Sequence, residues 1–401
     1  MRVLVAIFEE LVPLSGGGTP RTLNVIKAFI RRGYEVCVAC SIGVTKEEAL
    51  RELGCSDLLP LIGVSRLDTK KTTKYIYAHP LNILRVVKYA TRIKPDLIIC
   101  HNSIAGFSAL LGKKLKGECL VILDLTDLLF EYLEEYRDIL WMKPVQVMGR
   151  KMEKATIKNS DKIITISGTM RDILLGYRAS PENIEVVCDG VDTEVFRHTD
   201  ETQLRRKLAK GAKHVVILQG VIDLQDNPGI TVNAAEQVIG KYPKTMFWIV
   251  GDGMAVPELR KRVLAGGLSR NFYFSGWVRQ EEVSAYISAS DIGLVILPDV
   301  LSARGRVTLK EFEYWACGIP AVVPRLPALE EVVEEGKTGL FYDPGNAADL
   351  AEKIGILIED EEMRRKMGEN GKKMVKEKFQ WDRLADRFVE ICDGYLVGRK
   401  E

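Results

Sequence analysis

The chain has 401 residues, 46% of them hydrophobic and 28% charged, which is typical of a globular protein with room for two cores. Its 57 basic and 55 acidic residues leave a net charge of +2, so the overall charge gives no indication of nucleic-acid binding. No apolar run reaches the length that a membrane-spanning helix requires.

The first eight residues form an apolar run with the length of one strand. Glu9 and Glu10 follow this run directly, without the small residues of a signal-peptide cleavage site. We therefore interpret the run as a buried first strand, and we expect the protein in the cytoplasm.

Short β-branched runs recur along the chain, and a longer segment of helical period follows each of them. The predicted strands are 3–7, 35–39, 97–100, 121–123, 163–166 and 184–187 in the first half, and 215–218, 246–250, 272–274, 292–297 and 321–323 in the second. Continuous apolar strands separated by helices indicate an α/β protein with parallel sheets covered on both faces. Two such series indicate two doubly wound domains, and ligands bind such sheets beyond the carboxyl ends of the strands.

The boundaries between the domains follow from changes in the pattern. The polar segment 192–200 lacks strand character, so we predict a first domain at 1–195 and a second at 196–375. The last stretch, 376–401, has large apolar residues at roughly helical spacing, and we predict that it docks as a helix.

Cys37 and Cys40 have the spacing of a metal-binding or redox pair, but they lie within an apolar run. Positions three apart on a strand point to opposite faces, so the two thiols cannot easily share a metal. We predict that both cysteines pack in the core.

A glycine loop, Ser15-Gly16-Gly17-Gly18-Thr19, follows the first predicted strand and precedes a helix. Glycines at such a turn allow backbone amides to approach an anion at the helix N-terminus. A tight strand-to-helix turn without a ligand is the alternative. The spacing does not match the Gly-x-Gly-x-x-Gly fingerprint of dinucleotide binding, which makes a nicotinamide dehydrogenase a poor interpretation.

A second turn has the composition of a diphosphate site. Thr308 and Glu311 have the spacing of a capping box, so a helix should start at Thr308. Arg304, Arg306 and Lys310 flank this helix N-terminus, where cations and backbone amides together favour an anion.

Glu313 lies one turn into the same helix, among apolar residues, so its carboxylate needs a partner. The simple interpretation is an ion pair with a nearby cation. The functional interpretation, which we favour because of the adjacent diphosphate site, is that Glu313 accepts hydrogen bonds from the vicinal hydroxyls of a sugar.

The segment 310–323 resembles the C-terminal signature of retaining glycosyltransferase family 4, whose members have the GT-B fold. Further pieces match the family in the right order, so that the resemblance covers nearly the whole chain: the glycine loop, 32–36, 164–167, 184–192, 250–253, 274–278 and 339–341. The resemblance implies two Rossmann-like domains facing across a cleft, with the C-terminal helix crossing back to the first domain. It also implies a nucleoside-diphosphate-sugar donor on the second domain, an acceptor on the first, and sugar transfer with retained anomeric configuration.

The resemblance also implies roles for single residues. Glu313 matches the glutamate that binds the donor ribose, Gly16 and Gly17 match the loop that closes over the diphosphate, and Asp127 falls beside the position of the donor-sugar histidine. The predicted catalytic residues are Asp127, from this match to the family, and Lys310, from its place beside the predicted diphosphate site. The predicted donor-binding residues are Gly16, Gly17, Gly18, Gly220, Asn227, Arg306, Thr308, Leu309 and Glu313. No metal and no other cofactor are expected, because the chain has no evident Asp-x-Asp site beside a strand end.

The chain departs from the family pattern at five positions. Gly305 stands where the signature has its first glutamate, and Thr126 stands where the family has its histidine. Val221 and Asn227 occupy the places of an arginine and a lysine that grip the diphosphate, and Asp189 replaces an asparagine. A catalytically silent GT-B protein that binds a nucleotide or a partner is therefore the alternative to an active enzyme; an epimerase or a phosphorylase of the same fold is more remote.

Membrane contact is a further hypothesis for the first domain. Basic residues gather at 70–74 and at Arg85, Lys88, Arg92 and Lys94, and the predicted helix 128–158 adds apolar residues. Such a surface fits a peripheral enzyme that acts on a lipid-linked acceptor. Solvated basic helix faces are the alternative. The expected partners are thus a nucleotide sugar, a carbohydrate or lipid-linked acceptor and an anionic membrane surface, and no nucleic acid.

Overall fold

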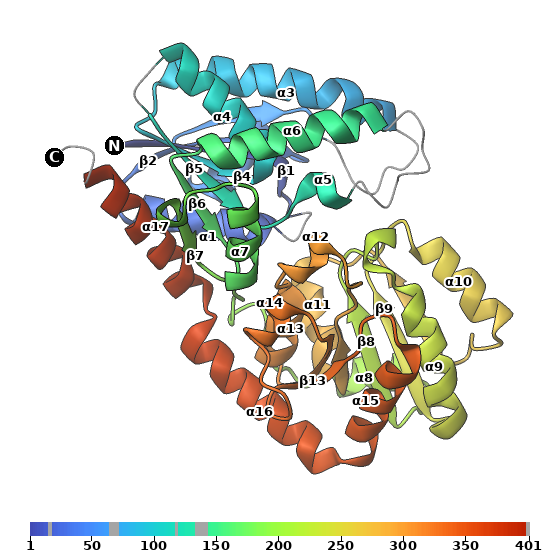
Figure 1. Ribbon diagram of the computed structural model, residues 1–401. Helices are drawn as coiled ribbons and strands as arrows, with labels where there is room; N and C mark the ends of the chain where they lie inside the picture. Colours follow the sequence, from blue (N-terminus) through green and yellow to red (C-terminus); the bar gives the residue numbers. More distant parts are fainter. Residues whose placement is uncertain (15–17, 64–71, 117–118, 133–142, 398–401) are drawn as a thin grey trace. The chain divides into compact units, whose positions relative to one another are not determined.

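The computed structural model describes residues 1–14, 18–63, 72–116, 119–132 and 143–397. It divides into two compact units (Figure 1). The first contains Met1–Asp189 together with Trp381–Glu401, and the second contains Gly190–Gln380. The division lies a few residues from the predicted boundaries at 195 and 375.

The first unit is a seven-stranded parallel sheet with helices on both faces. Its strands are β1 (Arg2–Val12), β2 (Glu35–Ile42), β3 (Asp57–Leu61), β4 (Leu97–His101), β5 (Leu120–Leu125), β6 (Lys162–Thr165) and β7 (Ile184–Val186), in the order β3-β2-β1-β4-β5-β6-β7. Its helices are α1 (Thr19–Arg31), α2 (Lys46–Leu53), α3 (Thr72–Ile93), α4 (Asn102–Lys116), α5 (Leu129–Tyr132), α6 (Lys143–Asn159), α7 (Gly168–Gly176), the 3-10 helix η4 (Pro181–Asn183) and α17 (Trp381–Val397).

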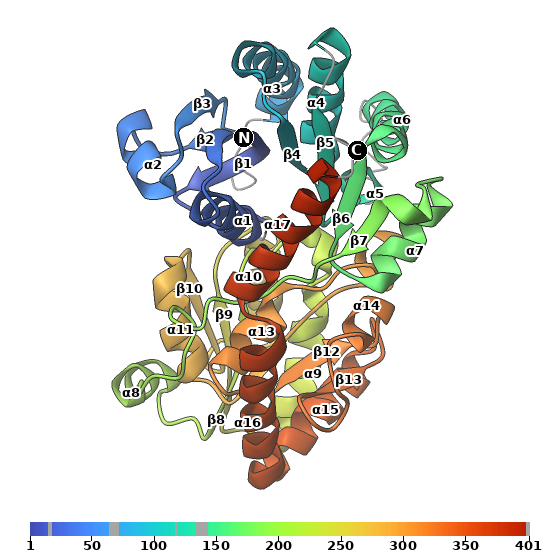
Figure 2. The same cartoon turned by 90° about the vertical axis from the view of Figure 1, so that its left-hand side faces the viewer.

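Two layers of helices cover this sheet (Figures 1 and 2). Helices α3, α4, α6 and α7 bury apolar side chains against one face, and α1, α2 and α17 bury theirs against the other. Cys37 lies in the first of these cores and Cys40 in the second, which confirms that the two thiols point to opposite faces. Phe388 of α17 is fully buried beside α1, so this terminal helix belongs to the first unit.

The second unit is a six-stranded parallel sheet. Its strands are β8 (His214–Gln219), β9 (Thr245–Val250), β10 (Phe272–Gly276), β11 (Ile292–Leu294), β12 (Ala321–Pro324) and β13 (Gly339–Tyr342), in the order β10-β9-β8-β11-β12-β13. Its helices are α8 (Thr202–Ala209), α9 (Gly229–Lys241), α10 (Val256–Ala265), α11 (Gln280–Ser288), α12 (Leu301–Arg304), α13 (Leu309–Ala316), α14 (Pro327–Glu330), α15 (Ala347–Glu359) and α16 (Glu361–Lys378), with the 3-10 helix η5 (Leu224–Asp226).

The predicted α/β class with two doubly wound parallel sheets is confirmed, and every predicted strand is present. Two strands were missed. β3 contains Pro60, which a central strand would not tolerate but an edge strand does, and β3 is the edge of its sheet. β13 is also an edge strand and has only four residues. Among the described helices, none combines the length and the apolar content of a membrane span.

Candidate functional site

The carboxyl end of β8 is the centre of a candidate site in the second unit. Gln219 is the last residue of the strand, and Gly220 follows it with a φ of +106°, which favours glycine. A Cβ atom on Gly251, at the end of β9, would lie only 2.0 Å from the carbonyl oxygen of Gly220. Glycine at both positions therefore lets the chain after β8 and the chain after β9 pass in close contact.

Helix α13 begins beside this edge, with the predicted capping box. The backbone amide of Thr308 donates to a carboxylate oxygen of Glu311 at 2.8 Å, and the Thr308 hydroxyl donates to the other oxygen. The predicted helix start at Thr308 is thus confirmed, with Thr308 as the N-cap residue of α13. Glu311 is fully buried, and burial raises its pKa to about 7. Leu309, the first residue of α13, remains partly exposed.

Lys310 places its ammonium group at Gly220. A Cβ atom on Gly220 would lie 3.4 Å from Cε of Lys310 and 3.8 Å from its Nζ. The side chain is only partly exposed, and within the described part of the chain its Nζ makes no hydrogen bond or salt bridge. Lys310 therefore offers a cation without an ion pair at the backbone that follows β8, with the buried Glu311 and Glu313 as its electrostatic neighbours.

Glu313 completes this arrangement from the next turn of α13. Its carboxylate is buried and accepts a hydrogen bond from the side-chain amide of Gln219. Burial raises the pKa of Glu313 to about 8, although Gln219 and the charge of Lys310 act in the opposite direction. Glu313 has no ion pair within the described residues, so the simple interpretation of an ion pair is not what the structure has.

The two arginines before α13 differ from Lys310 because acidic residues already neutralise them. Arg306 donates to Asp226 at 3.1 Å, with 16% of its side chain exposed. Arg304 donates to Asp299 at 2.5 Å and is half exposed. Of these three cations, Lys310 is therefore the one most available to bind an incoming anion.

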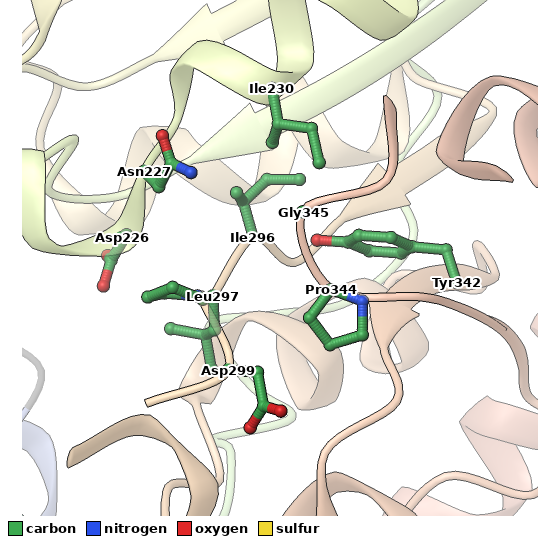
Figure 3. A pocket seen from close by; sticks show the side chains of 10 residues that line it. Asp226, Asn227, Ile230, Ile296, Leu297, Asp299, Tyr342, Pro344 and Gly345 are labelled. Atoms are coloured by element: carbon green, nitrogen blue, oxygen red, sulfur yellow. The ribbon is translucent and has the colours of Figure 1, made fainter. Parts of the chain in front are cut away.

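Asn227 lines a small cavity beyond the ends of β8, β11 and β13 (Figure 3). The cavity measures about 70 Å³, which is room for a few water molecules. Asp226 and Asp299, the partners of the two arginines, also lie in its wall, as do Leu297 and Tyr342. Asn227 has a φ of +50°, so it serves a tight turn as well.

The first unit has its own candidate residues at the carboxyl ends of its strands. Gly18 is the N-cap residue of α1, whose N-terminus has no side-chain cap. Gly16 and Gly17 lie outside the described residues. The imidazole of His101, at the end of β4, faces Gly18 so closely that a Cβ atom there would lie 2.2 Å from Nε2.

A buried charged cluster holds this imidazole. Nδ1 of His101 lies 3.4 Å from Asp124 of β5, and Nε of Arg21 donates to Asp124 at 2.8 Å. Arg21 also donates to Asp189 at 3.0 Å. Burial raises the pKa of Asp189 to about 6, although Arg21 acts to lower it. All four side chains are buried, so their charges are poorly screened.

Asp127, the other predicted catalytic residue, follows β5. The hydroxyl of Thr126, at the family's histidine position, lies 3.3 Å from a carboxylate oxygen of Asp127 and 3.4 Å from Oδ1 of Asn102. Asp127 is partly exposed and has further interactions, and the structure does not bring it together with His101 by any described bond.

Sequence reasoning assigned no role to His101, Gln219 or Arg21. The signal for His101 was its position, because it directly follows the predicted strand 97–100 and pairs in register with Asp124, which directly follows the predicted strand 121–123. Gln219 likewise ends β8, and its partner comes from a helix 94 positions later in the sequence. Arg21 lies in a helix whose pattern of apolar residues did not reveal that the arginine is buried.

The predicted apolar surface around helix 128–158 is wrong in part. Leu128 is fully buried and packs in the core, and Leu129 is only partly exposed. The residues at 70–71 and 140–142 lie outside the described part of the chain. Within the described part of this segment, α5 covers Leu129–Tyr132 and α6 covers Lys143–Asn159.

Two protein-family models together match almost the whole chain. The model described as "Glycosyltransferase Family 4" matches residues 15–195, and the model described as "Glycosyl transferases group 1" matches residues 200–374. A sulfoquinovosyl transferase of Arabidopsis thaliana is 25% identical over 393 residues, which are 94% of this chain and 71% of that protein. N-acetyl-alpha-D-glucosaminyl L-malate synthase of Bacillus anthracis is 25% identical over 240 residues, which are 59% of this chain and 60% of that protein.

Solved structures resemble the chain over its full length. HepE of Anabaena, in complex with UDP-glucose, has a TM-score of 0.77 at 17% identity and covers 98% of this chain and 100% of its own. Sucrose-phosphate synthase of Thermosynechococcus elongatus has a TM-score of 0.78 at 17% identity and covers 99% of each chain. At such identities the likeness concerns the fold alone, and it agrees with the two Rossmann-like units described above.

Proposed function

Because this chain belongs to the group 1 glycosyltransferases of family 4, which are enzymes of sugar transfer, we propose that it uses a nucleoside-diphosphate sugar as donor and retains the anomeric configuration. The acceptor is a carbohydrate, a lipid-linked molecule or a small molecule. UDP-hexoses are the first donors to test, since HepE has been solved with UDP-glucose.

The observation that carries the proposal is the arrangement of Lys310, Gly220 and Glu313 at the end of β8. Gly220 presents backbone without a side chain, the ammonium group of Lys310 lies beside it, and the α13 N-terminus adds backbone dipoles. Glu313 offers a buried carboxylate to the two ribose hydroxyls, in place of water. Gln219 fixes that carboxylate in position.

The chemistry follows from where charge develops. When the sugar leaves, negative charge grows on the diphosphate, and donors that are already in place stabilise it without reorganisation. Lys310 and the α13 amides supply such donors, with Arg306 held nearby by Asp226. Asp127 and the loop of Gly16, Gly17 and Gly18 are proposed to act from the first unit. No metal is part of the proposal.

A screen of nucleotide sugars tests this function. We expect one class of donor, UDP-, GDP- or ADP-linked, to raise the melting temperature, and we expect turnover of that donor to continue in excess EDTA. Nuclear magnetic resonance should then find a product with the donor's anomeric configuration. Loss of turnover in EDTA that magnesium restores would contradict the metal-independent mechanism, and an inverted product would contradict retention.

A catalytically silent nucleotide-binding protein is the second candidate function. It is favoured by Arg306, whose charge Asp226 already neutralises, and by Gly305 at the position of the first signature glutamate. The same screen separates the two candidates. A silent protein is stabilised by the nucleotide, yet it releases no sugar from any donor.

We also propose that the first unit docks on an anionic membrane through the layer formed by α3, α4 and α6 (Figure 1). Helices α3 and α4 contain no Asp or Glu, and the one acidic residue of α6, Glu153, is buried. The exposed basic residues of the layer include Arg85, Lys88, Lys114, Lys151 and Lys158. Exposed apolar residues lie among them: Leu81, Leu84, Leu115, Val147 and Met148. Cations and apolar side chains together fit anionic lipid better than nucleic acid.

Flotation with liposomes tests the membrane contact. Phosphatidylglycerol vesicles should carry the protein, phosphatidylcholine vesicles should not, and salt should weaken the binding. The double substitution Arg85→Glu with Lys88→Glu should abolish flotation. Lys366→Glu with Lys373→Glu, which changes the charge equally on exposed positions of α16, should not. Equal flotation of both variants would overturn the proposed surface.

A further inference from the structure

Glu153 of α6 is a carboxylate buried inside the first unit, and the proposed function gives it no role. The residue is 0% exposed. The hydroxyl of Ser103, in the first turn of α4, donates to Oε1 of Glu153. Oε2 is buried too, and it makes no hydrogen bond of ordinary geometry with the described residues. A buried carboxylate oxygen in this situation is rare and calls for an explanation.

The start of α5 lies beside this carboxylate. The backbone amides of its first two residues, Leu129 and Phe130, act to lower the pKa of Glu153, as donors do when they approach a charged oxygen. Helix α5 has only four residues, too few for a helix to be stable by itself. A Cβ atom on Gly149, one turn earlier in α6, would lie 2.1 Å from the ring of Phe130. Helix α6 therefore holds α5 by close packing at Gly149 and by the carboxylate of Glu153.

The charge of Glu153 depends on groups from each helix around it. Burial raises its pKa, the charge of Glu131 on α5 acts in the same direction, and the hydroxyl of Ser103 and the two α5 amides act in the opposite one. The net result is a pKa of about 7. Glu131 itself is compensated, because Arg150 of α6 donates to it at 3.1 Å and the hydroxyl of Tyr177 of α7 donates to it at 2.7 Å. Glu153 therefore changes its charge near neutral pH.

Two adjacent residues at the start of α4 hold the chain on both sides of Asp127. Before Asp127, the backbone amide of Thr126 donates to Oδ1 of Asn102 at 3.3 Å. Asn102 has a φ of +64°, which is uncommon for a residue other than glycine. After Asp127, helix α5 begins two residues later and lies against Glu153, which accepts from Ser103. The position of Asp127 is thus coupled to the buried carboxylate.

We propose that Glu153 is a positioning residue for Asp127, because its carboxylate anchors the first turn of α5 and thereby fixes the segment that begins at Asp127. This inference rests on the proposed function, in which Asp127 acts during sugar transfer. The ionised carboxylate accepts hydrogen bonds from backbone amides more strongly than the protonated group does. The anchor should therefore be firm above the pKa of Glu153 and should weaken as the pH falls through about 7.

Hydrogen exchange of the amides in 128–132 tests the anchor on the full chain, without any substrate. Corrected for the intrinsic pH dependence of exchange, their protection in the wild type should rise about tenfold from pH 6 to pH 8. Glu153→Gln has the same shape but cannot ionise, so its protection should stay at the low value. Glu153→Asp keeps a carboxylate and should retain a rise of smaller size. Glu47→Gln, at an exposed position of α2 in the same unit, is the control and should follow the wild type.

Kinetics with the donor found in the screen test the link to Asp127. Glu153→Gln should lower kcat about tenfold at pH 8 and leave the KM for the donor unchanged, because the proposed donor contacts of Lys310 and Glu313 belong to the second unit. At pH 6 the variant and the wild type should have the same kcat. A role in stability alone would instead lower the active fraction without this dependence on pH.

The two measurements separate the inference from the proposed function. Equal exchange profiles in the wild type and in Glu153→Gln would overturn the anchor and leave the proposed function intact. A pH-dependent anchor with equal kcat in both proteins at pH 8 would overturn the link to Asp127. Absence of sugar transfer from every donor would contradict the proposed function, whereas the exchange experiment would still decide whether Glu153 anchors α5.

Discussion

Gln219 donates its side-chain amide hydrogen bond to the carboxylate of Glu313, so the last residue of β8 and the second turn of α13 are joined through two buried polar groups. The bond holds Glu313 at the carboxyl edge of the sheet, where a ligand is expected. It does not remove the cost of burying a carboxylate, because Gln219 is neutral and the charge of Lys310 does not compensate it fully. The stability of the second unit should therefore depend on this one group.

We expect Glu313→Gln to stabilise the fold at alkaline pH. Burial raises the pKa of Glu313 from 4.5 to about 8, so between these values the folded state holds a proton that the unfolded state has released. The stability from this group is therefore fully present below the lower value and is lost as the pH rises through the upper one. Gln keeps the acceptor for Gln219 and cannot ionise.

Thermal unfolding at pH 5 and at pH 9 checks this prediction. The variant should gain on the order of 1–4 kcal/mol at the higher pH and almost nothing at the lower one. Glu369→Gln, at an exposed glutamate of α16, is the control. A gain of the same size at both values would mean that Glu313 is ionised throughout this range.

Glu313 should favour nucleotide binding, although it lowers the stability of the fold at alkaline pH. Glu313→Ala removes the acceptor of two hydrogen bonds from the ribose hydroxyls, and we expect the affinity for the cognate nucleotide to fall by more than about 1 kcal/mol. Calorimetry with the nucleoside diphosphate and with its 2′,3′-dideoxy analogue checks the role. The analogue should bind the wild type and the variant equally. If the variant binds the intact nucleotide as tightly as the wild type does, the proposed role of Glu313 is refuted.

Alanine substitutions at Lys310, Arg304 and Arg306 should show how much each cation contributes to kcat/KM. Lys310→Ala should lower kcat/KM by roughly ten- to a hundredfold, because it removes the cation at Gly220, which has no ion pair among the described residues. Arg304→Ala should have no effect, since Arg304 is half exposed and paired with Asp299. Arg306→Ala should lower kcat/KM by less than Lys310→Ala does and by more than Arg304→Ala does. Equal kinetics for the lysine and Arg304 variants would show that the diphosphate lies elsewhere.

Gly18→Ala should destabilise the first unit although the backbone at Gly18 is in an ordinary conformation. The added methyl group would meet the imidazole of His101, and such overpacking costs roughly 1–3 kcal/mol. In Gly18→Ala with His101→Ala, the loss should be smaller than the sum of the two single losses. Chemical denaturation of the three variants measures this coupling, and strict additivity would mean that the two residues do not press on each other.

The sequence was sufficient for the fold class because both sheets are parallel and buried on two faces. Such strands are continuous apolar runs, and the helices between them have a different period, so both can be recognised without tertiary contacts. The capping box at Thr308 and Glu311 was also predictable, because its two hydrogen bonds are made within one turn of helix. The edge strands β3 and β13 were not predicted, because an edge strand does not need the continuous apolar pattern of a strand in the sheet interior.

Only the tertiary structure decided which polar groups meet. Arg306 and Lys310 are four positions apart and look equivalent as cations in the sequence, yet Asp226, 80 positions before Arg306, neutralises one and leaves the other. His101 and Gly18 look unrelated until β1 and β4 pair and bring the end of β4 to the start of α1. Charge pairing and close packing depend on distances between segments remote in the chain. Local pattern contains no information on those distances, because they are set by the order and register of the strands.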